Sequence, residues 1–430
     1  MSVERNTKIR FFLAFWLFVL SAIAFMDRTN IAIAGLHIMH DFGLSDTRLG
    51  SVSSAFLLGY AGLQVPAGWA AAKFGPRKTL TAGVLLWAVA TGLIVLLPTG
   101  MAHAIVILML LRFILGAGES VMYPSANQFV ARWIPVQERG KINGLIFAGV
   151  GAGAGLTPPL MNWLILNHGW RSAFALSAVL FVIAGLVWWL GSRDTPQQHP
   201  MVSPGELAVI KAGLPAVKAT DVSATGENKI SWGAMFRRRD LLALMASYFS
   251  FGYVSWIFFA WFFIYMAQVR HVNLKLSAIF TMLPFLAMMV ASFSGGAISD
   301  KMTRSYGLRV GRCGIAVVSM LLTAAFLMIG SQVESASLAG LFLAGGAGAL
   351  YLSQSSFWSA SADIAGRSSG VFSGIMNMAC QIGGALTASL TPWIALHFGW
   401  ITAFAVAASL AVIGSLCWLT VHPERPLVAD

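Results

Sequence analysis

The chain contains twelve apolar segments, each about as long as a membrane is thick. A helix needs roughly 20 apolar residues to cross about 30 Å of hydrocarbon. With 57% hydrophobic and only 10% charged residues, the 430 residues carry too little polar surface to coat a soluble globule. We therefore expect an all-α membrane protein with twelve transmembrane helices, near 11–36, 48–71, 79–98, 103–130, 141–166, 171–191, 240–267, 277–299, 313–331, 337–360, 369–396 and 400–420.

Lys and Arg residues gather on one side of these predicted spans. If the N-terminus is cytoplasmic, most of the 28 Lys and Arg residues fall in cytoplasmic loops, and the opposite loops hold only Arg48, Arg171, Arg270 and Lys275. The positive-inside rule then predicts that both termini are cytoplasmic. The net charge of +12 is spread over loops rather than one folded face, so we expect no nucleic-acid partner.

An internal repeat divides the chain into two halves. Residues 169–176 (GWRSAFAL) recur as 399–406 (GWITAFAV), so the sixth span corresponds to the twelfth. We predict two six-helix bundles, 1–191 and 239–430, joined by a cytoplasmic loop at 192–238. A parallel repeat of this kind is typical of transporters whose halves rock around a midplane site. Coincidence of membrane composition is the alternative explanation of so short a match.

Two carboxylates, Asp27 and Glu119, lie inside predicted spans together with Arg28 and Arg112. A charged group at the centre of a membrane helix costs at least about 2.5–3.5 kcal/mol, so such residues usually face a cavity and mark an ion or proton path. A carboxylate held between apolar helices and a movable arginine can exchange a proton near neutral pH. The freed guanidinium then suits a substrate carboxylate. The alternative is that all four charges are internal salt bridges that only fix helix packing.

The sequence shows no sign of metal or catalytic chemistry. Cys313, Cys380 and Cys417 are scattered through apolar segments without a C-x-x-C motif or a nearby His pair. The glycine-rich segment 149–155 lacks the Lys-Ser/Thr of a phosphate loop and fits close helix packing instead. We expect no metal, no cofactor and no enzyme activity.

Several motifs resemble those of a known family. They are Gly68-x4-Lys73-Phe74-Gly75-Pro76-Arg77-Lys78, its echo Gly296-x3-Asp300-Lys301, Asp27-Arg28, and Arg112-x3-Gly116-x-Gly118-Glu119 followed by Tyr123-Pro124. Together they resemble the major facilitator superfamily and, within it, the anion:cation symporter branch. That resemblance implies proton-coupled symport that imports an organic anion, such as a sugar acid or another carboxylate, by alternating access. An organic anion exchanger or uniporter of the same fold, or an aromatic-acid permease, is the alternative.

The resemblance also assigns roles to individual residues. Asp27 and Glu119 would carry the coupling protons, Arg28 would contact the substrate carboxylate, and Arg112 would pair with Asp27. Substrate contacts are implied for Tyr60, Asn377 and Gln381, although interhelical hydrogen bonding would equally explain Tyr60 and Asn377. The conformational signature loop would comprise Gly68, Gly75, Arg77 and Asp300. The expected partners are a small organic anion, protons and membrane lipid, with a monomer in a bacterial cell inner membrane.

Some positions depart from the family pattern. Ala72 stands where the first signature loop usually has an acid, which puts the latch of the N-terminal half in doubt. Phe25 replaces a frequent Tyr, Gln381 replaces a frequent Asn, and Gly149 and Val150 occupy a region that is often polar in sugar-acid members. Because fewer side chains can hydrogen-bond to substrate hydroxyls, these departures suggest that the substrate is a less hydroxylated or partly aromatic acid.

Overall fold

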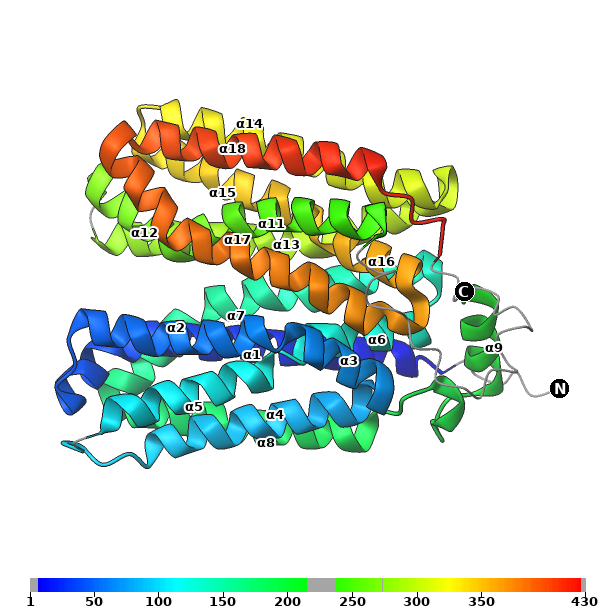
Figure 1. Ribbon diagram of the computed structural model, residues 1–430, viewed down its shortest axis with the longest axis horizontal. Coiled ribbons are helices and arrows are strands. Elements are labelled where there is room, and N and C mark those ends of the chain that lie inside the picture. The colour runs from blue at the N-terminus through cyan, green and yellow to red at the C-terminus, as the bar shows by residue number, and fades with distance from the viewer. Residues whose placement is uncertain (1–6, 102, 215–236, 273, 427–430) are drawn as a thin grey trace.

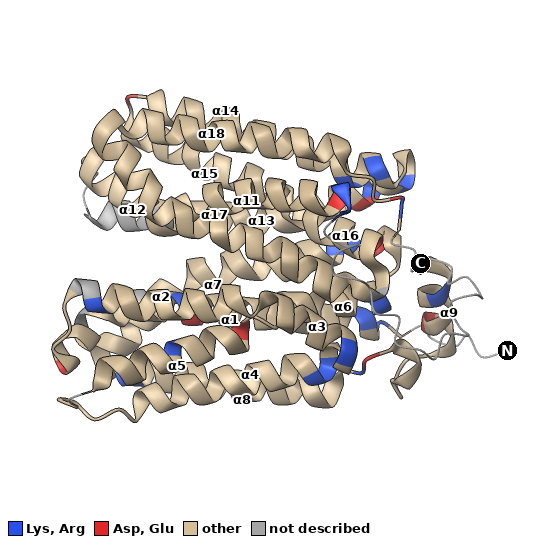
Figure 2. Ribbon diagram, viewed as in Figure 1, with Lys and Arg blue, Asp and Glu red and all other residues tan. Residues whose placement is uncertain are grey.

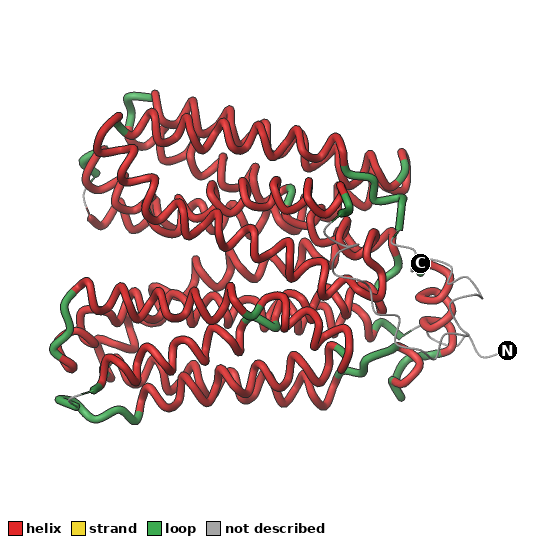
Figure 3. The backbone as a smooth tube through the Cα atoms, viewed as in Figure 1, coloured by secondary structure: helices red, strands yellow, loops and turns green. Residues whose placement is uncertain are grey.

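The computed structural model describes residues 7–101, 103–214, 237–272 and 274–426, and every regular element in them is helical. Figure 1 shows two bundles that lie side by side, and Figure 3 shows that only short loops connect the helices within each bundle. The first bundle comprises α1 (Ile9–Phe42), α2 (Asp46–Gly62), α3 (Gln64–Phe74), α4 (Pro76–Val95), α5 (Ala104–Glu119), α6 (Met122–Trp133), α7 (Arg139–His168) and α8 (Trp170–Gly191). We call it the N-bundle.

The second bundle, called the C-bundle, repeats this arrangement. It comprises α11 (Arg239–Ala260), α12 (Phe262–Ile264), α13 (Leu274–Tyr306), α14 (Ile315–Gln332), α15 (Ala336–Leu352), α16 (Gln354–Ala365), α17 (Ser369–Phe398) and α18 (Trp400–Cys417). A short helix, α9 (Pro204–Gly213), lies between the bundles in the sequence. The predicted fold class, a helical membrane protein of two bundles, is confirmed.

Eleven helices of the described residues are long and apolar enough to cross a membrane, and the remaining expected span, 48–71, is broken at Leu63 into α2 and α3. Proline explains this break. Pro66 has no N–H to donate to the carbonyl of Gly62, four residues earlier. Pro124 acts in the same way on Ser120, and the fourth span divides there into α5 and α6.

The two copies of the repeat make the same turn. Gly169 and Gly399 end α7 and α17 with φ of +78° and +83°, a backbone region that favours glycine. The next helix begins directly at Trp170 in one bundle and at Trp400 in the other. The repeated Gly-Trp pair is therefore a structural corner.

Basic residues cluster at one end of the molecule. The first and last described residues, Thr7 and Pro426, lie at that end, which we call the termini end. Figure 2 shows most of the blue Lys and Arg positions there, with few at the opposite end. Large apolar side chains such as Leu166 and Leu396 are exposed on the outside of the bundles, as expected for surfaces that contact lipid.

The linker helix α9 is attached to the start of α1 by one buried carboxylate. Glu206 accepts hydrogen bonds from the hydroxyl of Thr7 (2.6 Å), the backbone N–H groups of Ile9 (3.0 Å) and Arg10 (3.1 Å), and the Arg10 guanidinium (3.1 Å). Burial alone would raise the pKa of Glu206, but these donors together hold it below its ordinary value. Ionised Glu206 thus anchors α9 to the N-bundle.

Replacing this carboxylate should weaken the anchor. We expect Glu206→Ala to lower the melting temperature of the purified protein, because hydrogen bonds to a charged group each contribute about 1.5–3 kcal/mol. A group with a depressed pKa stabilises the fold above its unfolded-state value, about 4.3 for Glu, and this contribution is lost as pH falls through the lower folded-state value. The difference from wild type should therefore shrink in acid. Lys211→Ala, an exposed change on the same helix, is the control, and equal melting of both variants would contradict the anchor.

Candidate functional site

A cavity of about 430 Å³ lies between the two bundles. Its walls come from the middle of the helices and from the helix halves farther from the termini end. Leu49 and Ser53 of α2 and Pro158 of α7 are examples of the latter. Both bundles contribute, chiefly through α1, α2 and α7 on one side and α11 and α17 on the other. This is the type of midplane site that a two-bundle transporter uses.

Two ion pairs join α1 to α5 at the wall of this cavity. Arg28 Nε lies 2.8 Å from Glu119 Oε2, and Arg112 Nη1 lies 3.4 Å from Asp27 Oδ2. The seven-residue spacing of Arg112 and Glu119 is two helical turns, which puts both on the face of α5 that meets α1. The carboxylates of Asp27 and Glu119 are fully buried, whereas both arginines line the cavity. Each carboxylate therefore reaches the cavity through its arginine.

Aromatic rings surround the Arg28 guanidinium. Its carbon Cζ lies 4.3 Å from the ring centroid of Tyr60, 4.6 Å from that of Phe25 and 5.4 Å from that of Phe56. Such contacts favour a cation over the ring faces. The buried Nη2 of Arg28 has no hydrogen-bond partner among the described residues, and neither does Glu119 Oε1. The guanidinium thus keeps a donor that Glu119 does not use, while Nε stays bound to Glu119.

The C-bundle wall of the cavity is polar but uncharged among the described residues. Asn377 donates from Nδ2 to the hydroxyl of Tyr60 (3.4 Å), so this contact crosses between the bundles. Gln381 also lines the cavity, and its buried Oε1 has no partner in the described part of the chain. The structure therefore places Tyr60, Asn377 and Gln381 at the same cavity as Arg28.

Sequence reasoning missed other polar groups of this wall. Gln354 donates from Nε2 to the hydroxyl of Tyr248 (2.8 Å), and the hydroxyls of Ser255 and Tyr351 are 3.1 Å apart. All four residues line the cavity. Gln354 could have been noticed as an amide inside an apolar span, but single hydroxyls in membrane helices are too common to stand out.

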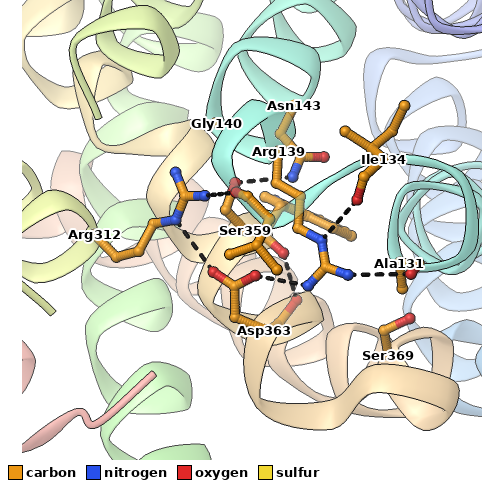
Figure 4. A network of polar contacts seen from close by, with 12 residues as sticks. Ala131, Ile134, Arg139, Gly140, Asn143, Arg312, Ser359, Asp363 and Ser369 are labelled. Carbon is orange, nitrogen blue, oxygen red and sulfur yellow. Dashed lines mark hydrogen bonds and ion pairs between the residues drawn. The ribbon is translucent and has the colours of Figure 1, made fainter. Parts of the chain in front are cut away.

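A buried charge network joins the bundles at the termini end, as Figure 4 shows. Asp363 of α16 lies 2.6 Å from Arg139 Nη1 of α7 and 3.2 Å from Arg312 Nε. Arg312 Nη1 in turn lies 2.8 Å from Asp300 Oδ1. Asp300 also accepts from the backbone N–H groups of Gly140 (2.8 Å) and Lys141 (2.6 Å), at the start of α7. A carboxylate at a helix N-terminus is favoured there by the helix dipole.

This network adds two buried carboxylates to Asp27 and Glu119, the two that the sequence placed inside predicted spans. Asp300 and Asp363 are 2% and 6% exposed, and Arg139 and Arg312 are fully buried. Their positions near helix ends suggested loops and solvent. The packing of the second bundle against the first covers them instead, which a linear sequence does not reveal.

A second, uncharged contact closes the same end beside α3. Gln128 of α6 accepts from the backbone N–H of Gly370 (2.9 Å) and the hydroxyl of Ser369 (3.2 Å), at the start of α17. Gly68 packs directly against the Gly370 backbone, and a side chain at either glycine would collide. Gln128 thus caps α17 as Asp300 caps α7. The acid missing at Ala72 has a neutral substitute from another helix.

Two other signature-loop residues hold the N-bundle together internally. Gly75, with φ of +89°, turns the chain between α3 and α4 beside the Asp194 carboxylate. The backbone N–H of Arg77 donates to Asp194 (2.9 Å), and its guanidinium donates to the Trp189 carbonyl (2.8 Å) and lies over the Trp189 ring. These contacts fix the loop to the end of α8.

Comparison with known proteins agrees with this geometry. Residues 17–388 match the Major Facilitator Superfamily. The chain is 31% identical to the probable sulfoacetate transporter SauU of Cupriavidus necator over 403 residues, covering 93% of this chain and 91% of that one. It is 25% identical to the hexuronate transporter of Bacillus subtilis, covering 96% and 94%. The proton:xylose symporter XylE superposes with a TM-score of 0.78 at 16% identity, covering 96% of each chain.

The family that matches and the curated relatives are transporters, so the chain is a membrane transporter and not an enzyme. The chain belongs to the Major Facilitator Superfamily, as its motifs predicted. In the described residues, no group of three or more His, Cys, Asp or Glu side chains could hold a metal ion.

Breaking the charge network should open the termini end. Asp363→Asn leaves Arg139 and Arg312 buried beside a neutral group, and losing one partner of a buried ion pair costs about 3–5 kcal/mol. Ser356 is fully buried on α16 between the cavity residue Gln354 and Asp363. The probe is Ser356→Cys in a background with Cys313, Cys380 and Cys417 replaced by Ala. With Asp363→Asn added, we expect this probe to react faster with a membrane-impermeant maleimide applied at the termini end than it does with Asp363 intact.

The matched control is Asp194→Asn, which makes the same chemical change at the same end but within one bundle. Its probe should react at the wild-type rate. Equal labelling rates in the two variants would show that the Asp363 network does not hold the bundles together.

Proposed function

We propose that the protein is a proton-coupled symporter that imports an organic anion by alternating access. The observation that carries this proposal is the paired arrangement at the cavity: two buried carboxylates, each bound to an arginine that itself faces the cavity. The relatives, a probable sulfoacetate transporter and a hexuronate transporter, support an anionic substrate.

The orientation follows from charge. The positive-inside rule makes the basic termini end cytoplasmic, so the cavity faces the outside. The network of Asp300, Asp363, Arg139 and Arg312 then closes the cytoplasmic side. For a bacterial cell inner membrane, where protons flow inward, this geometry favours import.

Coupling would begin at Glu119. With its carboxylate ionised, Arg28 is neutralised and attracts an anion weakly. When Glu119 takes up a proton, Arg28 carries an uncompensated charge in a nearly dry site, which strongly favours binding of a carboxylate or sulfonate. The proton and anion together restore neutrality, and the bundles can then rock without exposing an unpaired charge to lipid. Asp27 and Arg112 form the second proton-carrying pair in this scheme, and protons are the only coupling ion required.

The coupling role of Glu119 is open to a direct test. In proteoliposomes, we expect Glu119→Gln to abolish accumulation of organic acids driven by a pH gradient while preserving exchange of substrate across the membrane, because the glutamine mimics the protonated acid. Glu334→Gln, an exposed change far from the pair, serves as the control. Normal accumulation by Glu119→Gln would refute the coupling role, and uptake that ignores the pH gradient in the wild type would identify an exchanger or uniporter.

Arg28 should require its guanidinium. Lysine keeps the charge but cannot bind Glu119 and a carboxylate with separate fixed donors. We expect Arg28→Lys to weaken binding of the transported acid by about ten-fold or more, since a lost charged hydrogen bond costs about 1.5–3 kcal/mol. Arg48→Lys, at an exposed position of α2, should bind as wild type. Binding is measured by titration calorimetry on the purified protein, and unchanged affinity of Arg28→Lys would contradict its role.

A further inference from the structure

A positively charged corner lies on the N-bundle at the termini end, where α4 begins and α8 ends. Arg77 is the second residue of α4, and Arg193 is the second residue after α8. The two side chains are close enough for their charges to repel each other. Like charges held near one another cost free energy unless a counter-charge lies nearby. The corner is therefore a place where an anion would be stabilised.

Backbone carbonyls, rather than carboxylates, hold the two guanidinium groups in place. Arg77 donates from Nε (3.0 Å) and Nη2 (2.8 Å) to the carbonyl of Trp189. Arg193 donates from Nη1 to the carbonyls of Leu190 (3.1 Å) and Ser192 (2.6 Å). These contacts satisfy carbonyls that the end of α8 leaves without helical partners. Within the described residues, neither guanidinium forms an ion pair with a carboxylate.

The neighbouring carboxylate of Asp194 does not neutralise this corner. It attracts Arg77, but its Oδ1 accepts the backbone N–H of Arg77 (2.9 Å), and it lies against the turn at Gly75. One carboxylate beside two guanidinium groups leaves one positive charge in excess. A guanidinium has five N–H groups, and neither arginine uses all of its own on the carbonyls of α8. Donors for an anion thus remain on both side chains.

The surface beside these cations is apolar and partly aromatic. Trp189 is 36% exposed, and its ring centroid lies 4.1 Å from Arg77 Cζ. Leu190 is 71% exposed, and the half-exposed ring of Phe12 on α1 approaches α8 at Gly191. Exposed Trp next to basic side chains is typical of the level at which a protein passes from lipid tails to headgroups. A molecule that fits this corner has an anionic head and apolar chains.

We propose that this corner binds an anionic phospholipid from the leaflet at the termini end. The headgroup phosphate lies between Arg77 and Arg193 and supplies the missing negative charge. Phosphate oxygens suit the planar donor geometry of two guanidinium groups. The acyl chains lie along Trp189, Leu190 and Phe12. The bound lipid ties the start of α4 to the end of α8, and this interaction depends neither on the substrate nor on the coupling ion.

The corresponding corner of the C-bundle has a different charge pattern. Arg309 donates from Nη2 to the carbonyl of Leu419 (2.9 Å), just after α18, so the backbone contact is repeated. Leu419 offers no ring to the guanidinium, however. The next arginine in the sequence, Arg312, is fully buried in the charge network and has two carboxylate partners. Exposed Arg309 therefore lacks an unpaired neighbour, which makes it a matched control at the same end.

Lipid competition on the full-length purified protein tests this proposal. Native mass spectrometry, with equal amounts of phosphatidylglycerol and phosphatidylcholine of the same acyl chains, reports the ratio of the two bound lipids. We expect the wild type to favour phosphatidylglycerol, because the choline cation already neutralises the phosphate of the other lipid. Arg193→Gln should lower this preference about five-fold, the effect of one basic side chain near an anionic headgroup. Arg193→Lys should retain most of it, because the charge remains.

Arg309→Gln should show the preference of the wild type. Equal binding of the two lipids by the wild type, or an unchanged preference in Arg193→Gln, would overturn the proposal. An equal loss in Arg309→Gln and Arg193→Gln would also overturn it, because the preference would then reflect the basic charge of the whole termini end. If Arg193→Gln does not fold, Trp189→Leu replaces it, and this variant should likewise bind less phosphatidylglycerol relative to phosphatidylcholine.

A soluble phosphate ester distinguishes a lipid site from a site for free anions. Glycerol 3-phosphate has the headgroup charge but no acyl chains, so it should leave bound phosphatidylglycerol in place when added at the same concentration. Displacement of the lipid by glycerol 3-phosphate would show that the apolar surface contributes nothing and would refute a lipid site. Phosphatidylglycerol should also raise the melting temperature of the wild type more than that of Arg193→Gln, and equal rises would contradict the tie between α4 and α8.

Discussion

The pairing of Arg28 with Glu119 is the interaction on which the cavity depends. A guanidinium and a carboxylate can remain ionised between apolar helices only if they neutralise each other, since each alone would lose its hydration without compensation. Their 2.8 Å contact keeps the carboxylate behind the wall and the guanidinium at its surface. The second pair, Arg112 with Asp27, repeats this arrangement two turns away along α5. A ligand or proton that neutralises one member of a pair therefore leaves the charge of the other member without its partner.

Closure at the termini end combines close backbone packing with buried charge. Gly68 meets the Gly370 backbone, and Gly140 meets the Gly296 backbone, at distances that no side chain would allow. Small residues bring helices near enough to exclude water. The carboxylate of Asp300 then accepts backbone N–H groups across the interface. A dry, tightly packed contact of this kind has few intermediate arrangements, which suits a gate that is either shut or open.

The two halves share a fold but divide the chemistry between them. The N-bundle supplies the charged pairs of the cavity, and the described C-bundle wall supplies amides, phenols and rings. At the termini end, the C-bundle supplies the charged helix-capping group, Asp300. The N-bundle supplies the neutral amide of Gln128, in place of an acid at Ala72. The contacts of Gln128 with Ser369 and Gly370 join neutral groups, whereas Asp300 carries a charge to the start of α7 at the same end.

The sequence by itself determined the helical membrane fold, the repeat and the presence of two carboxylates and two arginines inside apolar spans; the structure showed that Arg28 pairs with Glu119. An apolar segment of about 20 residues indicates a membrane span, and a Gly-Trp pair indicates a turn between two helices. A charged residue within an apolar segment is recognisable however the helix packs. Only the tertiary structure decided that Asp300 and Asp363 are buried, that Gln128 replaces the missing acid, and that Gln354 and Tyr248 face the cavity. These features depend on how the helices pack together in three dimensions. Contacts such as Arg139–Asp363 and Gln128–Gly370 join residues more than 200 positions apart in the sequence, and no local pattern encodes them.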